Sequence, residues 1–121
     1  GGYVSLGHDE YIKHKTGDNY IPIGQRLKYA TSFIKNHDWL SVDPWEGVFA
    51  PGAVNFTSVV HRLNLYLKKH YADDISIFFV CGADNARFAL TFKNYQEFQE
   101  FGTVIVRRPK YNERINKYLD I

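Results

Sequence analysis

The sequence has few of the residues that cross-link a chain, bind metals or anchor it in a membrane. Its single cysteine, Cys81, excludes an internal disulfide framework and a cysteine zinc cluster, and is typical of a reducing compartment. Its five histidines show no metal-ligand spacing. No apolar run approaches the roughly 20 residues that span a bilayer, and no signal-peptide pattern is present. We expect a soluble protein without a membrane partner, in the cytoplasm or, in a eukaryote, also in the nucleus.

A strong charge of one sign is also missing. The net charge is only +2, which lacks the basic footprint of a dedicated DNA-binding domain, so no nucleic-acid partner is expected. The small positive excess suits a pocket for phosphates. Aromatic residues are abundant at 17% and supply both core and flat stacking surfaces. A length of 121 residues allows one domain with one core.

Apolar segments of strand length alternate with segments of helical periodicity. We expect strands at 3–5, 39–42, 75–81 and 103–106, helices from about 22, 55 and 111, short helical pieces between 85 and 101, and loops at 7–19 and 47–53. The run 75–81 is apolar without alternation, as in a strand covered on both faces. The pattern predicts an α/β fold, a Rossmann-like doubly wound parallel sheet with helices on both faces.

Ligands of such sheets bind beyond the carboxyl ends of the strands, so the segments after each strand are the informative ones. After the first strand, Lys13 and Lys15 could meet a phosphate and Tyr11 could donate a hydrogen bond, although a solvated loop explains the same letters. After the second strand, Trp45 either faces a ligand or covers the edge of the core.

Two further segments follow the later strands. Gly82 lets a ligand approach the backbone, and Asp84 could accept hydrogen bonds from a ribose, although a plain turn fits equally. The cations Arg107, Arg108 and Lys110 could anchor a triphosphate or form a solvated surface. Cys81 reads as a small core residue, because no base that could activate it is nearby in the sequence.

Taken together and in order, these segments resemble the nicotinamide/nicotinate mononucleotide adenylyltransferases, which belong to the α/β nucleotidyltransferase superfamily. Residues 1–5 resemble that family's G-G-[FY]-[IVL]-S-P strand end and residues 9–13 its D-x-Y-x-K loop. Residues 22–27 resemble its P-x-x-H-R-[VL] helix start, with Gln25 replacing the usual His and Arg26 retained. Residues 42–46 read V-D-P-W-E and residues 81–84 read C-G-A-D, a fairly specific pair. Related phosphopantetheine and glycerol-phosphate enzymes share the fold but lack V-D-P-W-E.

The resemblance implies an enzyme that transfers the adenylyl group of ATP to nicotinamide or nicotinate mononucleotide in NAD biosynthesis, with Mg²⁺ accompanying the ATP. It implies a contact between Lys13 and the mononucleotide phosphate, and a pyridine ring stacked on Phe56 beside Thr57, with Phe92 or Tyr95 as the opposing ring. The full set of acceptor-binding residues that we expect is Ser5, Tyr11, Lys13, Trp45, Phe56, Thr57 and Tyr95. ATP is expected at Gly82, Asp84 and Arg108.

The chain also departs from the family at both ends, since the opening H-x-G-H motif and the closing S-[ST]-x-x-R motif are absent. We therefore expect residues 1–121 to be one partial nucleotidyltransferase domain, lacking the first strand and the C-terminal segment and inactive by itself. No catalytic residue and no metal ligand is assigned within it. The sequence leaves open a non-catalytic nucleotide-binding or assembly module, a different phosphate acceptor, amide or acid preference, and a homo-oligomer.

Overall fold

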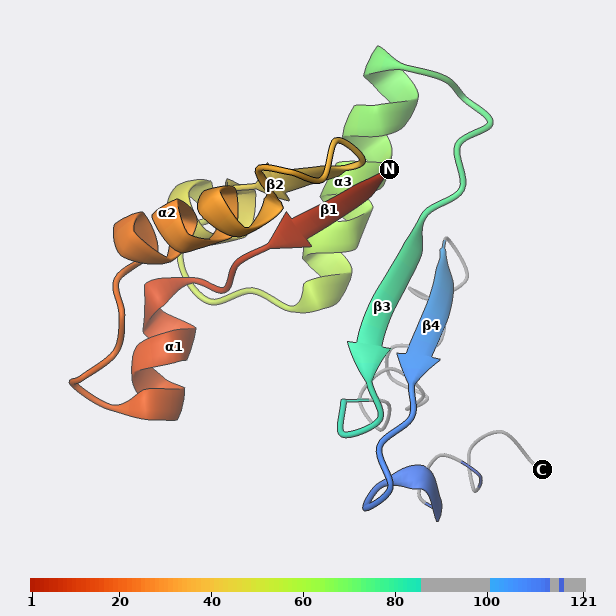
Figure 1. Cartoon of the computed structure of the whole chain (residues 1–121). Coiled ribbons are helices and arrows are strands. Elements are labelled where there is room, and N and C mark those ends of the chain that lie inside the picture. Colours follow the sequence, from red (N-terminus) through yellow and green to blue (C-terminus); the bar gives the residue numbers. More distant parts are fainter. Residues whose placement is uncertain (86–100, 114–115, 117–121) are drawn as a thin grey trace. The chain divides into compact units, whose positions relative to one another are not determined.

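The computed structural model describes residues 1–85, 101–113 and 116, in which strands and helices alternate along the chain (Figure 1). The chain divides into two compact units, Gly1–Val59 and Val60–Ile121. The described elements are β1 (Gly2–Ser5), α1 (Asp9–Thr16), α2 (Ile23–Ile34), β2 (Leu40–Asp43), a single π-helical turn (Trp45–Phe49), α3 (Phe56–His70), β3 (Phe78–Gly82) and β4 (Gly102–Val106). The predicted α/β class is confirmed.

The first unit is built on a parallel pair of strands. β1 pairs with β2 in a register that places Gly2 opposite Leu40 and Ser5 opposite Asp43. Parallel neighbours need a crossover connection, and α2 lies in the connection between these two strands. Because the pairing is parallel, both strands end at the same edge, where Ser5 and Asp43 are adjacent.

The segment after β1 differs from the sequence-based expectation, because residues 9–16 form the helix α1 instead of a loop. The Nδ1 atom of His8 accepts the backbone N–H of Glu10 at 3.1 Å and so caps the helix. Acidic residues occupy the first turn and basic residues the last, which suits the helix dipole. The helix ends at Gly17, whose φ of 81° places it in the left-handed region that favours glycine.

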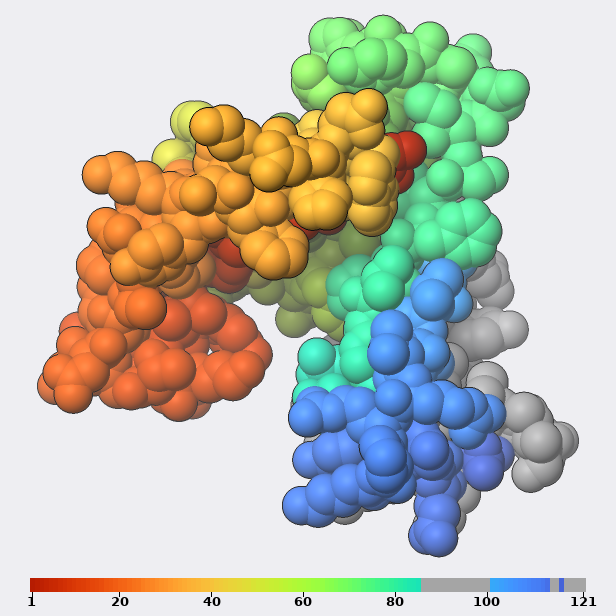
Figure 2. Space-filling view, viewed as in Figure 1, coloured from red at the N-terminus to blue at the C-terminus, as the bar shows by residue number. Residues whose placement is uncertain are grey.

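The second unit contains the other parallel pair, in which β3 and β4 are aligned from Phe78 opposite Gly102 to Gly82 opposite Val106. The atoms of these two strands lie directly against one another in Figure 2. Ala83, which follows β3, is 4% exposed and packs against Ile105 and Tyr111.

The expectation that this strand is covered on both faces is wrong for the described part of the chain. Phe78 is 61% exposed and Val80 is 62% exposed, on alternate positions of β3. On β4, Val104 and Val106 are also exposed. A continuous apolar run therefore did not distinguish a strand buried on two faces from one buried on a single face.

The helix starts at Pro22 and Asn55 were predicted closely. α2 follows Pro22, whose carbonyl accepts the N–H of Arg26 at 3.1 Å, and α3 follows Asn55, whose carbonyl accepts the N–H of Ser58 at 3.0 Å. No helix in the described ranges is long and apolar enough to cross a membrane. The helical pieces expected between 85 and 101, and most of the helix expected from 111, lie outside the described residues.

Two glycines of the first unit differ sharply in the space around them. A Cβ on Gly47, in the buried part of the π-helical turn, would lie 2.9 Å from Cγ1 of Ile23 and 3.2 Å from the carbonyl oxygen of Leu6. A Cβ on Gly24, in the first turn of α2, would meet no atom within 4 Å.

We predict that Gly47→Ala lowers the free energy of unfolding by about 1–3 kcal/mol through overpacking. Gly24→Ala, the same chemical change, should raise it by up to about 1 kcal/mol, because alanine loses less backbone entropy in a helix. Urea unfolding followed by circular dichroism measures both. A loss of stability in Gly24→Ala equal to that in Gly47→Ala would contradict this packing.

Candidate functional site

The carboxyl ends of β1 and β2 bring several polar side chains together. Ser5 Oγ donates a hydrogen bond to Oε2 of Glu46 at 3.2 Å, which links the end of β1 to the π-helical turn after β2. Asp43, only 5% exposed, accepts the backbone N–H of Trp45 on Oδ1 at 3.2 Å. This hydrogen bond fixes the direction in which the chain leaves β2. Ser5 and Trp45, two of the predicted acceptor-binding residues, therefore belong to neighbouring segments.

The surroundings of Glu46 shift the pKa of its carboxyl. Burial raises the pKa of its carboxyl above the ordinary value, and the hydrogen bond from Ser5 partly opposes that rise. The nearby carboxylate of Asp43 raises the pKa further, whereas His8 and Arg26 lower it. The balance favours the protonated form more than in an unfolded chain.

The predicted phosphate-binding residues lie on α1. Tyr11 and Lys13 are both exposed, and the Nζ atom of Lys13 lies 3.9 Å from a carboxylate oxygen of Asp18 in a solvent-accessible pair. Such a pair contributes little to stability, so the ammonium group can leave Asp18 for a ligand phosphate. One turn earlier, Oε2 of Glu10 accepts the backbone N–H of Ala53 at 3.3 Å. This contact holds α1 against the loop that leads into α3.

Phe56 and Thr57 begin α3. Thr57 is 5% exposed, so its side chain belongs to the packed interior of the structure described here, whereas Phe56 is half-buried. Tyr95 and Phe92, the predicted opposing rings, lie outside the described residues.

The second unit assembles the predicted ATP-binding residues at the carboxyl ends of β3 and β4. An Nη1 atom of Arg108 lies 3.2 Å from Oδ2 of Asp84. The guanidinium also lies over the ring of Tyr111, 5.7 Å from its centroid. Gly82 ends β3 directly beside them, and a Cβ at this position would lie 2.6 Å from Oδ1 of Asp84. Asp84, Arg108 and Tyr111 thus form one group of side chains beside the backbone of Gly82.

Sequence reasoning did not assign a site role to Glu46, Tyr111 or Arg26. Glu46 and Arg26 stood inside quoted motifs, and their residue types alone did not show which backbone or side-chain groups they bind. Tyr111 lies three residues after Arg108, a spacing that was visible, but its ring contact depends on the turn closed by the bond from the Tyr111 N–H to the Arg108 carbonyl.

A comparison with protein families matched residues 3–120 of the chain to the family described as Cytidylyltransferase-like. The match covers nearly the whole chain and supports a nucleotidyltransferase in general. A comparison with curated proteins gave no match.

The raised pKa of Glu46 predicts a pH-dependent stability. A carboxyl whose pKa is higher in the folded state stabilises the fold at pH values below its unfolded-state pKa, and this contribution is lost as pH rises through the folded-state pKa. Glu46→Gln keeps an oxygen that accepts the Ser5 hydrogen bond and does not ionise. We predict that the free energy of unfolding of the variant, relative to wild type, increases as pH rises from about 4 towards neutrality.

Urea unfolding at a series of pH values measures this difference. The matched control is Glu113→Gln, the same substitution at an exposed position. A Glu46→Gln difference that stays constant with pH, or that falls as pH rises, would contradict the proposed effect of burial.

Proposed function

The chain belongs to the cytidylyltransferase-like family, and we propose that it serves adenylyl transfer from ATP to nicotinamide or nicotinate mononucleotide, a step of NAD biosynthesis. One observation carries the proposal. The V-D-P-W-E segment and the C-G-A-D segment each coincide with the carboxyl end of a parallel strand, β2 and β3 respectively. In α/β folds this is the position of ligand-binding residues.

The acceptor mononucleotide is assigned to the first unit. Lys13 supplies a positive charge for its phosphate, and Tyr11 on the same helix supplies a hydrogen-bond donor. Ser5 and Trp45 line the edge at the ends of β1 and β2. Phe56 is proposed to stack on the pyridine ring; its half-buried position leaves part of the ring accessible. Thr57 is proposed as a buried support for Phe56. Tyr95, which lies outside the described residues, stays a candidate opposing ring on the resemblance alone.

ATP is assigned to the group at the ends of β3 and β4. Gly82 carries no side chain, so the carboxylate of Asp84 lies against its backbone, and Asp84 can accept hydrogen bonds from ribose hydroxyls there. Arg108 is 57% exposed on its side chain, so its guanidinium can turn from Asp84 to the phosphates without a large desolvation cost.

In the proposed reaction an oxygen of the mononucleotide phosphate attacks the α-phosphorus of ATP. A new P–O bond forms at the α-phosphorus. The bond between the α-phosphorus and the oxygen that bridges it to the β-phosphorus breaks, and pyrophosphate leaves with that electron pair. The protein contributes positioning and charge stabilisation. Mg²⁺ is proposed as a companion of the ATP phosphates; the described residues assemble no group of three or more metal-binding side chains, and no protein ligand is assigned to it.

We place this activity in the cytoplasm, or also in the nucleus of a eukaryotic cell. The free, buried thiol of Cys81 supports a reducing compartment.

The test is adenylyl transfer by the intact full-length protein, with each mononucleotide, ATP and Mg²⁺, following NAD and its acid form. We predict that Lys13→Ala raises the KM for the mononucleotide by about ten- to a hundredfold, the size of one lost charge-assisted hydrogen bond. The KM for ATP should change little, because Lys13 is assigned to the acceptor.

The matched control is Lys28→Ala, which removes the same charge from an exposed position on α2 that has no assigned site role. It should leave both KM values close to wild type. Product from neither mononucleotide despite bound ATP would reject the proposal in favour of another acceptor or a non-catalytic nucleotide-binding module.

A further inference from the structure

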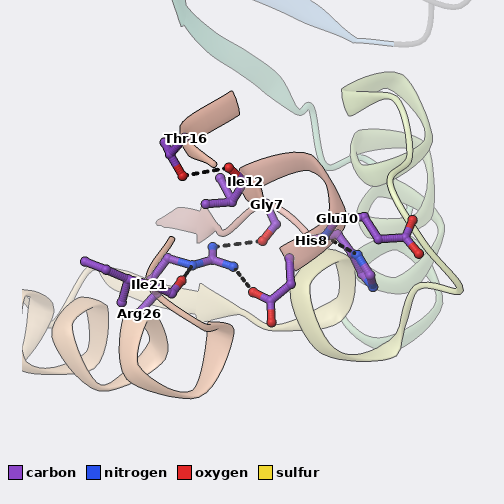
Figure 3. A network of polar contacts seen from close by, with 8 residues as sticks. Gly7, His8, Glu10, Ile12, Thr16, Ile21 and Arg26 are labelled. Carbon is purple, nitrogen blue, oxygen red and sulfur yellow. Dashed lines mark hydrogen bonds and ion pairs between the residues drawn. The ribbon is translucent and has the colours of Figure 1, made fainter. Parts of the chain in front are cut away.

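One guanidinium group joins three separate chain segments of the first unit. Arg26, on α2, donates from Nη1 to the carbonyl oxygen of Gly7 at 2.8 Å and from Nη2 to Oδ1 of Asp9 at 2.6 Å. Its Nε donates to the carbonyl oxygen of Ile21 at 2.7 Å. Figure 3 shows the guanidinium of Arg26 between the labelled residues Gly7 and Ile21.

The three acceptors lie on both sides of α1. Gly7 and Asp9 belong to the segment where the chain leaves β1 and begins the helix, and Ile21 belongs to the segment that returns from it to α2. The guanidinium therefore joins the chain segment before α1 to the chain segment after it. The side chain of Arg26 is 14% exposed and that of Asp9 is 30% exposed, so solvent screens their ion pair only partly.

Only arginine can make this arrangement. Its planar fork presents several N–H donors in fixed directions, whereas a lysine ammonium is a single point at the end of a flexible stem. A lysine at this position could pair with Asp9 but could not also reach the carbonyl groups of Gly7 and Ile21 from their present places.

We propose that Arg26 is a positioning residue for the acceptor substrate: its guanidinium fixes the direction in which α1 presents Tyr11 and Lys13. This proposal rests on the proposed function, because that function assigns the mononucleotide phosphate to Lys13. Arg26 itself touches no substrate. Its effect reaches the substrate through the backbone on either side of α1.

The first test is a double-mutant cycle in the intact full-length protein. Arg26→Ala should raise the KM for the mononucleotide on the order of tenfold and change the KM for ATP by less than about twofold. If Arg26 acts partly through Lys13, the double variant Arg26→Ala/Lys13→Ala should raise the mononucleotide KM by less than the product of the two single increases. Arg26→Lys should recover only part of the loss. Lys28→Ala, which removes an exposed charge from the same helix, is the matched control.

The second test does not need activity. Amide hydrogen exchange of Asp9–Thr16 should accelerate in Arg26→Ala, while exchange in β3 and β4 stays at the wild-type rate. Acceleration throughout the chain would indicate a general structural role and overturn the proposal. The proposal would also be overturned by an unchanged mononucleotide KM in Arg26→Ala or by equal changes in the KM values of both substrates. A KM increase in the double variant equal to the product of the two single increases would overturn it as well.

The two proposals fail in different ways. A wild-type protein that forms no product removes the adenylyltransferase proposal, and the exchange experiment then still decides whether Arg26 holds α1. A wild-type protein that forms product, with an Arg26→Ala variant of wild-type KM and wild-type exchange, removes only the positioning role.

Discussion

Within the first unit, the hydrogen bonds of Arg26 join the chain segments on either side of α1. A helix as short as α1 is marginal by itself in water, because nucleation costs more than a few intrahelical bonds return. None of its residues is fully buried and Ile12 is half-buried, so apolar packing holds the helix only in part. What fixes it are polar contacts at its beginning: the His8 cap, the Glu10 bond to the loop before α3, and the guanidinium that joins Gly7, Asp9 and Ile21.

A second constraint acts at the ends of the strands. Parallel pairing brings the carboxyl ends of β1 and β2 to one edge and those of β3 and β4 to one edge within their own unit. At the first edge a serine and two carboxylates meet, and burial of Glu46 makes its ionisation costly. At the second edge an exposed aspartate–arginine pair lies beside a glycine. The first edge is thus partly desolvated, whereas the second is open to a charged ligand.

Several features of the fold could be predicted because they follow from local chemistry. Pro22 and Asn55 marked helix starts, the apolar runs marked the strands, and their alternation with helices indicated parallel pairing. The helix α1 was missed because its apolar periodicity is weak. Its acidic first turn and basic last turn, which suit the helix dipole, were nevertheless visible in the sequence. So was Gly17, which ends the helix. The exposure of Phe78 and Val80 could not be predicted, since a strand of apolar residues has the same residue types whether one or both of its faces are covered. The roles assigned to the site residues, and the reading of the chain as one partial domain, stay predictions.

By itself, the sequence determined the α/β class, the order of the strands with α2 and α3, and the positions of the motifs at strand ends, because periodicity and turn chemistry act between residues close in the chain. Tertiary structure alone decided which distant groups meet. Ser5 reaches Glu46 across 41 positions because β1 and β2 share a register, and Arg26 finds three acceptors because the chain folds back at α1. Such contacts depend on directions in space that residue types do not encode one by one, so the burial of Glu46 and the role of Arg26 became visible only in the folded chain.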